Sequence, residues 1–478
     1  MKKSDYFVLL NMPDDGTINI DDVSFNEEKN EKIIHISRDP FPTYCNGCGF
    51  RMHSRGIKKR TVNHPVMQDG SRIKLIIRQR RWKCPNCSHE ENESFPFIEP
   101  YKQSSSITPL LVLDAMKDIN RTAVSVARQF NLSDSTVHDI FTKYVDLKRL
   151  SLPEYISIDE VYLNISNDMK YAFVIMDFSN GQIVDIVHNR WSSTLEEYFL
   201  KIPLAERRNV RGIISDAYGP YQNLCERFFP NAKAVLDSFH VVRFIINRLN
   251  GYINELLRKH RKKQQDKLQE KNFRTNRDSQ TIKDSEEIIL LRDYRWLLLK
   301  NREDINYGLR MHYHKKLGMS VNTFALERKF FDLDRNLTVF RDLKEKYIDF
   351  NNDQYDSLDD VEKRLTALIN EYYKCNHKIF IEFADFLLEH FDGIVRSFSI
   401  TEVSRKTKKD QEAYYSRLSN GPMESFNRKP KDLKRNSRGF SNFDYTRNRI
   451  LWSTRDNPPI LGIPKSNEEI HSYHKKKK

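Results

Sequence analysis

The stretch YISIDEVYL, residues 155–163, alternates apolar and polar side chains, which is typical of a β-strand with one face in a core. Two acids lie within it, and the alternation places Asp159 and Glu160 on opposite faces. The next apolar segment, YAFVIMDFSNGQIVDIVHNR, predicts two more strands, because its Asn-Gly pair favours a tight turn between antiparallel partners. The sheet is therefore expected to open with three consecutive antiparallel strands.

Two further strands are predicted, each after a helix. VRGIISDAYGPY contains an apolar strand that ends at Asp216, and AKAVLDSFH contains a fifth strand that ends at Asp237. Three antiparallel strands, a helix, a strand, a helix and a strand follow the order of an RNase H-like fold. The first and fourth strands of that fold are neighbours about 4.8 Å apart, so Asp159 and Asp216 are expected to share a cation. Asp237 lies one strand further out, which makes Asp216 the preferred partner.

A third carboxylate is expected after a long helical insertion. The chain contains 17 prolines, yet none lies between Pro230 and Pro422, which predicts that most of this stretch is helical. The segment SNGPMESFNRKPKDLKR follows, and Glu424 at the start of its helix is the candidate. Carboxylate oxygens suit Mg²⁺, and metal-dependent phosphodiester cleavage needs two such ions about 3.5–4 Å apart. The alternative is that Glu424 is a surface charge neutralised by the surrounding cations.

Two Cys-x2-Cys pairs, in TYCNGCGF and RWKCPNCSH, predict a structural zinc site near the N-terminus. Together the pairs supply the four thiolates that complete the tetrahedral shell zinc prefers: Cys45, Cys48, Cys84 and Cys87. A redox dithiol is the alternative, but such a pair usually occurs singly before a helix. The loop between the pairs is rich in Lys and Arg, so this module is expected to touch DNA.

Residues 121–144, RTAVSVARQFNLSDSTVHDIFTKY, predict two helices joined by a turn at the spacing of a helix-turn-helix. Val124 and Ala127 are expected on the packed face of the first helix, and Ser133 is expected to cap the second. Polar residues of the second helix are expected to face a DNA major groove: Ser133, Asp134, Ser135, His138 and Asp139. An ordinary helical hairpin fits the same pattern.

The charge balance indicates a polyanionic partner. The chain has 80 Lys and Arg against 66 Asp and Glu, which gives a net charge of +14 and a pI near 9.2. Such a bias favours nucleic acid or an anionic membrane. No apolar run approaches the roughly 20 residues of a membrane span, and the N-terminus lacks the pattern of a signal peptide. These features predict a soluble cytosolic protein.

The segments YISIDE, GIISDAYGPY, LDSFHV, SNGPMESFNRKPKDLKR and RGFSNFDYTRNRIL, behind the paired cysteines and the helix-turn-helix pattern, together resemble one family. The chain is similar to the DDE transposases of bacterial insertion sequences, of the ISL-three type, over roughly residues 31–455. The resemblance implies an RNase H-like core interrupted by a helical insertion. It also implies a catalytic triad that falls on Asp159, Asp216 and Glu424 and holds two Mg²⁺ or Mn²⁺ ions.

The resemblance also implies how the protein grips DNA. Many DDE enzymes hold phosphate with a cation seven residues past the glutamate, which here is Lys431, on the same helical face as Arg428. Pro430 departs from the pattern of a continuous helix, because proline removes a backbone donor and clashes with the preceding turn. The implied partners are the element's ends and target DNA, both double-stranded, with a homodimer on the ends. The implied location is the bacterial cytoplasm, in association with the nucleoid.

The expected architecture is a multidomain α+β chain that combines DNA-binding modules with a divided catalytic core. Its segments are a zinc-finger domain (1–100), a helix-turn-helix domain (101–150), the first part of the RNase H-like core (151–240), the helical insertion (241–410), the last part of the core (411–455) and a basic tail (456–478). The leading hypothesis is a transposase that cleaves DNA at its element's ends and joins the freed ends to target DNA. The alternatives are a catalytically inactive DNA-binding regulator and an RNase H-like nuclease without strand transfer.

Overall fold

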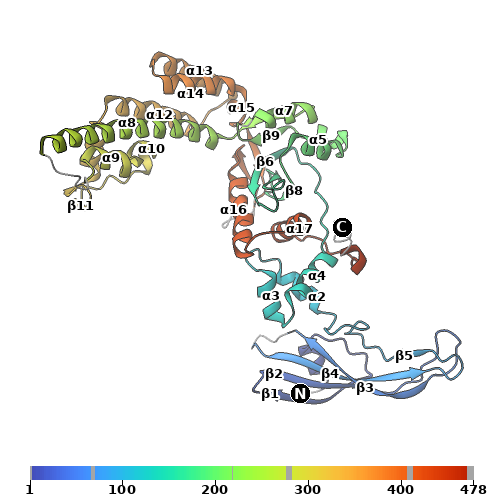
Figure 1. Ribbon diagram of the computed structural model, residues 1–478. Helices are drawn as coiled ribbons and strands as arrows, with labels where there is room; N and C mark the ends of the chain where they lie inside the picture. The colour runs from blue at the N-terminus through green and yellow to red at the C-terminus, as the bar shows by residue number, and fades with distance from the viewer. Residues whose placement is uncertain (1–2, 66–69, 218, 276–282, 406–412, 471–478) are drawn as a thin grey trace. The chain divides into compact units, whose positions relative to one another are not determined.

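The protein is a mixed α+β chain, as expected, and its contacts divide it into two compact units. The computed structural model describes residues 3–65, 70–217, 219–275, 283–405 and 413–470 (Figure 1). The first unit comprises residues 1–150, 161–172 and 426–478, and the second comprises residues 151–160 and 173–425. The last eight residues of the expected basic tail lie outside the described ranges. Within those ranges, no helix has the length and apolar character needed to cross a membrane.

A five-stranded sheet carries the cysteine pairs in the N-terminal part of the first unit. It follows helix α1 (Lys3–Leu9) and comprises β1 (Ile18–Asn26), β2 (Glu31–Arg38), β3 (His53–His64), β4 (Arg72–Lys83) and β5 (Glu90–Asn92). The strand order is β1-β2-β4-β3, and β5 pairs with β4. Alternate residues such as Ile34 and Ile36 are buried in one core with Phe7 of α1. The first cysteine pair precedes β3 and the second follows β4, so the hairpin brings the pairs together.

Four helices of the first unit pack together: α2 (Thr108–Ala115), α3 (Ala123–Phe130), α4 (Asp134–Tyr144) and α17 (Phe443–Thr454). Between α3 and α4 the chain turns at Asn131, which has a positive φ of 53°. The Ser133 hydroxyl accepts from the Thr136 backbone N–H at 3.1 Å, so the predicted cap of α4 is confirmed. Val124, expected on the packed face of α3, is instead 46% exposed, and Val126 is the buried valine.

The second five-stranded sheet has its strands in the predicted order along the chain. They are β6 (Tyr155–Tyr162), β7 (Tyr171–Asp177), β8 (Ile183–Val187), β9 (Gly212–Ser215) and β10 (Lys233–Leu236). In space the order is β10-β9-β6-β7-β8, with β9 parallel to both β6 and β10, and β7 antiparallel to β8. Helices α5 (Ser192–Leu200) and α6 (Leu204–Arg208) precede β9, and α7 (Gly219–Phe228) precedes β10. The first and fourth strands are therefore neighbours, as expected.

Most of the insertion is helical, as the absence of proline predicted. Its helices are α8 (Ser238–Thr275), α9 (Glu286–Asp293), α10 (Trp296–Leu299), the 3-10 turn η1 (Arg302–Asp304), α11 (Thr323–Phe331), α12 (Arg335–Asn352), α13 (Leu358–Lys374), α14 (Lys378–Glu389) and α15 (Phe391–Arg396). A small hairpin, β11 (His312–His314) with β12 (Met319–Val321), interrupts them. Val241, Ile245, Leu249 and Ile253 recur every four residues along α8 and are fully buried, and α12 packs along this helix (Figure 1).

The chain returns from the insertion through a two-stranded ribbon and helix α16 (Gly421–Asn436). The ribbon pairs β13 (Ile400–Val403) with β14 (Tyr414–Arg417), and its Val403 packs in one core with Ile214 of β9. Helix α16 continues through Pro430. The Pro430 ring is buried on the same helical face as Met423 and Leu433. Proline lacks a backbone N–H, so the helix loses one hydrogen bond here, and burial of the apolar ring offsets part of that loss.

Candidate active site and metal centres

The register of two parallel strands sets the positions of the first two candidate carboxylates. Ser157 of β6 lies opposite Ile214 of β9, and Asp159 and Asp216 each lie two residues further along. Because side chains alternate along a strand, an equal step of two residues keeps the two carboxylates level and on one face. The sequence-predicted pair therefore lies at one end of the sheet.

Burial and neighbouring charge raise the pKa of Asp159 to about 6. Loss of solvent is the largest cause, and the negative charges of Asp216 and Glu160 add to it. The Glu160 backbone N–H, which donates to Asp159 Oδ1 at 2.7 Å, and the nearby His240 act in the opposite direction. A half-buried carboxyl that resists ionisation beside another carboxylate is typical of a site that is completed by a cation.

Glu424 lies in the first turn of α16 and is grouped with Asp237 and His240. One ligand atom from each of these three side chains lies within 4.8 Å of the others. Asp237 directly follows β10, is 1% exposed, and its Oδ2 lies 4.0 Å from His240 Nε2. Burial raises the pKa of Asp237, while the hydrogen bond from the Asn420 backbone N–H and the nearby His240 lower it.

Asp216 and His240 act on the electrostatics of both Asp159 and Asp237. Asp216 raises the pKa of both Asp159 and Asp237, and His240 lowers the pKa of both. Glu424 shares its ligand group with Asp237 and His240, whereas among the described residues Asp159 and Asp216 do not belong to a group of three ligand atoms within 4.8 Å. Asp237 and His240 thus connect the predicted pair to Glu424, because His240 acts on the electrostatics of Asp159 and Asp237 shares its neighbour Asp216. Several oxygen donors with one imidazole fit Mg²⁺ or Mn²⁺ as donor chemistry.

Glu160 serves a different set of contacts. Its carboxylate accepts from the Tyr221 hydroxyl and pairs with Arg190. Burial and the hydrogen bond to Glu160 raise the pKa of Tyr221 far above its usual value, so this hydroxyl stays protonated and keeps donating. Glu160 therefore connects β6 to α7 through Tyr221 and to the β8–α5 connection through Arg190.

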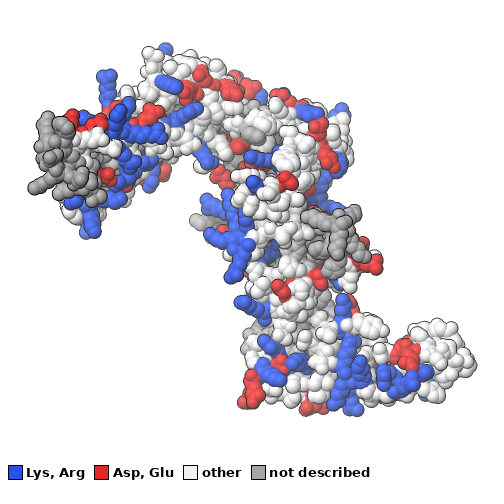
Figure 2. Space-filling model, viewed as in Figure 1, with Lys and Arg blue, Asp and Glu red and all other residues white. Residues whose placement is uncertain are grey.

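The helix that carries Glu424 also carries the predicted phosphate-binding cations. Arg428 and Lys431 are both exposed, one and two turns after the glutamate. Lys and Arg side chains gather over α16 (Figure 2). The Lys434 ammonium lies 4.2 Å from the centre of the Tyr162 ring, a cation–π contact that fixes the next turn of the helix.

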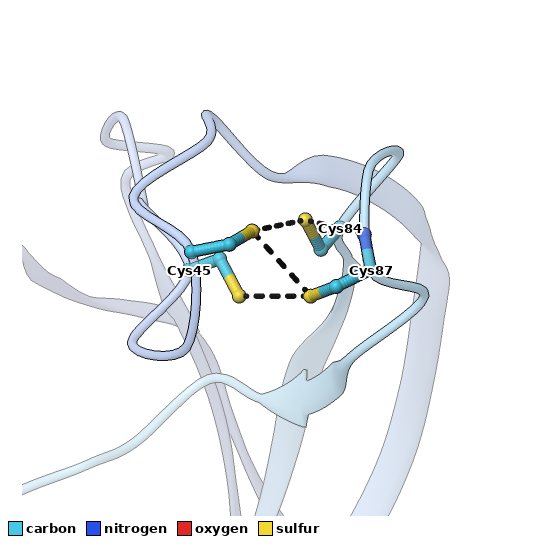
Figure 3. Close-up of side chains that lie close together, drawn as sticks. Cys45, Cys84 and Cys87 are labelled. Carbon is cyan, nitrogen blue, oxygen red and sulfur yellow. Dashed lines mark hydrogen bonds between the residues drawn. The ribbon is translucent and has the colours of Figure 1, made fainter.

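The four predicted zinc ligands form a closed cluster at the end of the N-terminal sheet. Their sulfur atoms lie 3.4 Å apart for Cys45 and Cys87, 3.4 Å for Cys48 and Cys84, and 3.5 Å for Cys48 and Cys87. The labelled side chains point toward one another across the two knuckles (Figure 3). Such spacings fit the tetrahedral shell of one zinc ion with Zn–S bonds of about 2.3 Å.

Hydrogen bonds around the four sulfur atoms also shift the pKa values of two of the thiols. The Phe50 backbone N–H, followed by the Asn86 and Cys84 side chains, lowers the pKa of Cys48 to about 6. The His89 backbone N–H lowers the pKa of Cys87, but its three cysteine neighbours raise it to about 12. Four convergent cysteine sulfur atoms are a donor set that could hold one zinc ion.

The predicted DNA-reading residues of α4 lie in two settings. Exposed side chains are those of Ser133, Asp134, Ser135 and His138, and Asp139 is half-buried. One side of the His138 ring lies 4.7 Å from the ring of Tyr445 on α17, and partial loss of solvent there lowers the pKa of His138 although the residue remains exposed. Helix α17 therefore covers part of the face that the sequence assigned to DNA.

Sequence reasoning missed three residues of this structure. His240 stands three positions after Asp237, so the spacing in DSFH could have indicated two side chains on one helical turn. Asn420 is 1% exposed and bonds to β6 at Ile158 and to the Asp237 carboxylate, and its place just before a Gly-Pro pair gave only a turn signal. Arg449 donates to two backbone carbonyls in the connection between α2 and α3, and no local sequence pattern contains this contact between distant segments.

The carboxylate group and the four convergent cysteines are arranged as metal-binding sites commonly are, and comparison with known proteins gives the family. Residues 156–450 match the family described as "Transposase", the ISL3 group of DDE enzymes. Because this match covers more than half of the chain, the protein belongs to that family.

Individual relatives are more distant. The chain is 26% identical over 275 residues to the transposase for insertion sequence element IS1001 of Bordetella parapertussis, a match that covers 55% of this chain and 60% of that protein. The chain thus spans less than two thirds of the relative's length. A chain of the simian T-cell lymphotropic virus intasome in complex with PP2A regulatory subunit B56 gamma is 12% identical, covering 42% of this chain and 71% of its own. Its TM-score of 0.15 is too low to bear on the fold.

Proposed function

We propose that the protein is a DNA transposase that binds the inverted repeats at its element's ends, cleaves the strands there and joins them to target DNA. The observation that supports this proposal is the pair of Asp159 and Asp216 on neighbouring strands, next to His240. That histidine shares a possible metal group with Glu424 and Asp237. The strand order supports an RNase H-like core, because the first strand lies between the second and the fourth. The family supports the reaction class.

We assign the three carboxylates to two Mg²⁺ or Mn²⁺ ions. When bound, such ions activate a water or 3′-hydroxyl for attack and stabilise the leaving oxygen. Asp159 and Asp216 present their oxygens from two adjacent strands, and Glu424 presents its own from α16, so three rigid elements fix the donor positions. Arg428 and Lys431 bind the phosphate backbone and set its register beside the carboxylates.

We assign the modules around this core to DNA recognition. The N-terminal sheet with its zinc site and the α3–α4 pair, as a helix-turn-helix, bind the element's ends, with Ser135 exposed at the start of the second helix. On this proposal the core comprises residues 151–240 and 411–455. The other segments are the zinc finger (1–100), the helix-turn-helix (101–150), the helical insertion (241–410) and the basic tail (456–478). A homodimer on paired ends and a place on the bacterial nucleoid complete the proposal.

A plasmid carrying the gene with its flanking DNA tests this function. Purified protein with Mg²⁺ should produce breaks that leave 3′-hydroxyl groups at inverted repeats, and should join those ends to a second plasmid. Breaks without joining would favour the nuclease. Sequence-specific binding without breaks would favour the regulator, and neither binding nor breaks would overturn the proposal.

A further inference from the structure

Asn420 connects the segments that carry two of the candidate carboxylates. Its side-chain amide donates to the Ile158 backbone carbonyl at 3.3 Å, immediately before Asp159. Its own backbone carbonyl accepts from the Glu424 backbone N–H at 3.0 Å, in the first turn of α16. Asn420 is 1% exposed, so both contacts are shielded from water. One buried side chain therefore sets the distance between β6 and the helix of the third carboxylate.

Asp237 adds the third segment to the same network. Its carboxylate Oδ1 accepts from the Asn420 backbone N–H at 2.9 Å. Its own backbone N–H donates to the Ser215 carbonyl at 3.0 Å, immediately before Asp216. Asp237 is also 1% exposed. Through these bonds the residues next to Asp159 and Asp216, and Glu424 itself, are all tied to the Asp237–Asn420 pair.

We infer that Asp237 and Asn420 are positioning residues that hold the three metal-binding carboxylates of the proposed transposase at a fixed spacing. This inference rests on the proposed function and adds to it a rigid support that is not part of the triad. Two metal ions about 3.5–4 Å apart tolerate little movement of their ligands, and residues behind the ligands commonly provide that rigidity.

The competing role for Asp237 is that of a fourth carboxylate ligand. Its Oδ2 accepts no hydrogen bond among the described residues and lies near His240 and Glu424. The two roles need different atoms. Positioning needs an acceptor at Oδ1, which an asparagine also supplies, whereas metal ligation needs the negative charge, which asparagine lacks.

The test compares Asp237→Asn, Asp237→Ala and Asn420→Ala. Titration calorimetry measures the Mn²⁺ affinity of each variant. A separate assay measures cleavage of the plasmid that carries the flanking DNA. Asp237→Ala and Asn420→Ala should each lose about 10–100-fold in Mn²⁺ affinity, the usual cost of removing a residue that supports a metal ligand. Their cleavage should partly recover at high Mn²⁺. Asp237→Asn should lose far less, because it keeps the acceptor for the Asn420 N–H.

Asp185→Ala is the matched control for loss of a buried acid. Asp185 is 5% exposed, lies on β8 of the same sheet and accepts from the Tyr198 hydroxyl at 2.9 Å. This variant should lower the thermal midpoint while Mn²⁺ affinity stays at the wild-type value. Equal damage from Asp237→Asn and Asp237→Ala would make Asp237 a metal ligand, and wild-type Mn²⁺ affinity in Asn420→Ala would end the positioning role. A wild-type protein that binds Mn²⁺ but cuts no DNA would count against the proposed function, and the Mn²⁺ affinities would still decide the positioning role.

Discussion

The indole N–H of Trp452 donates to the backbone carbonyl of Leu113 at 2.9 Å, which joins the helix after the candidate active site to the helices before it. Arg449, on the same helix, donates to the carbonyls of Asp118 and Arg121 at 2.8 and 2.9 Å. Burial lowers the pKa of Arg449 to about 10, so the side chain is still charged at neutral pH. The α2–α4 helices thus depend on a segment more than 300 residues away, as the span of these contacts shows.

Arg449→Met should destabilise this helical body, because it leaves two backbone carbonyls without their charged donor. A hydrogen bond to a charged group contributes about 1.5–3 kcal/mol, and the loss should appear as a lower urea midpoint. Arg435→Met is the matched control, since Arg435 is exposed and its pair with Asp432 is worth about 0–1 kcal/mol. Equal midpoints for the two variants would mean that α17 does not support these helices.

The contrast between α4 and α17 shows what the sequence could and could not predict. The cap at Ser133 and the strand order from Tyr155 to Leu236 were predictable, because capping and alternation are local. The Arg449 contacts were not, because they join segments with no shared pattern. At the site, Asp159, Asp216 and Glu424 were predicted from strand ends and the family resemblance, and their role as a triad stays a prediction. The bonds of Asn420 depend on tertiary geometry that only the structure contains.

Metal analysis of the purified protein should find one zinc per chain, because four thiolates fill a single tetrahedral site. Cys84→Ser should release the zinc and weaken DNA binding. The far-ultraviolet signal of the helices should change little, since Cys84 belongs to the N-terminal sheet region. Cys225→Ser is the control, because Cys225 is a buried thiol outside the cluster. Full zinc content in Cys84→Ser would remove this ligand from the site.

Divalent metal should stabilise the protein more at pH 7.5 than at pH 5. The folded-state pKa of Asp159 is about 6, above its usual value of 3.8, so the folded protein holds this proton more tightly than the unfolded chain does. Protonation of Asp159 therefore favours the folded state at low pH, and this contribution to the free energy of unfolding is lost as the pH rises through about 6. Above pH 6 the carboxylate is charged and a bound cation offsets the repulsion from Asp216. Below it, the metal must first displace a proton. Thermal midpoints with and without Mg²⁺ at both pH values check this, and an equal shift at both would contradict it.

DNA affinity and DNA selectivity should respond to different residues. Lys431→Ala should weaken binding to all DNA alike and reduce the slope of log affinity against log salt by about 0.9, the value for one phosphate contact. Ser135→Ala should mainly reduce preference for the element's ends over random DNA, by about 1–3 kcal/mol if Ser135 contacts a base. Fluorescence anisotropy at several salt concentrations separates the two effects. An unchanged preference in Ser135→Ala would assign α4 to packing alone.

Glu424→Gln should abolish cleavage while DNA binding persists. The substitution keeps the size of the side chain and removes the charge that holds a cation beside Asp237 and His240. Cleavage in Mg²⁺ should fall by several orders of magnitude, because each 1.4 kcal/mol of lost transition-state stabilisation costs about tenfold in rate. Binding in a gel shift should hold or tighten, since one negative charge near the phosphates is gone.

Glu402→Gln gives the matched control for that result. Glu402 is an exposed glutamate on β13, in the same unit, and lies outside the groups of residues that could hold a metal. If Glu424 were only an exposed charge among cations, both variants would behave alike, because surface pairs contribute about 0–1 kcal/mol. Near wild-type cleavage in Glu424→Gln would therefore exclude it as the third ligand. Asp237 would then be the next carboxylate to test, because it lies within the same 4.8 Å group.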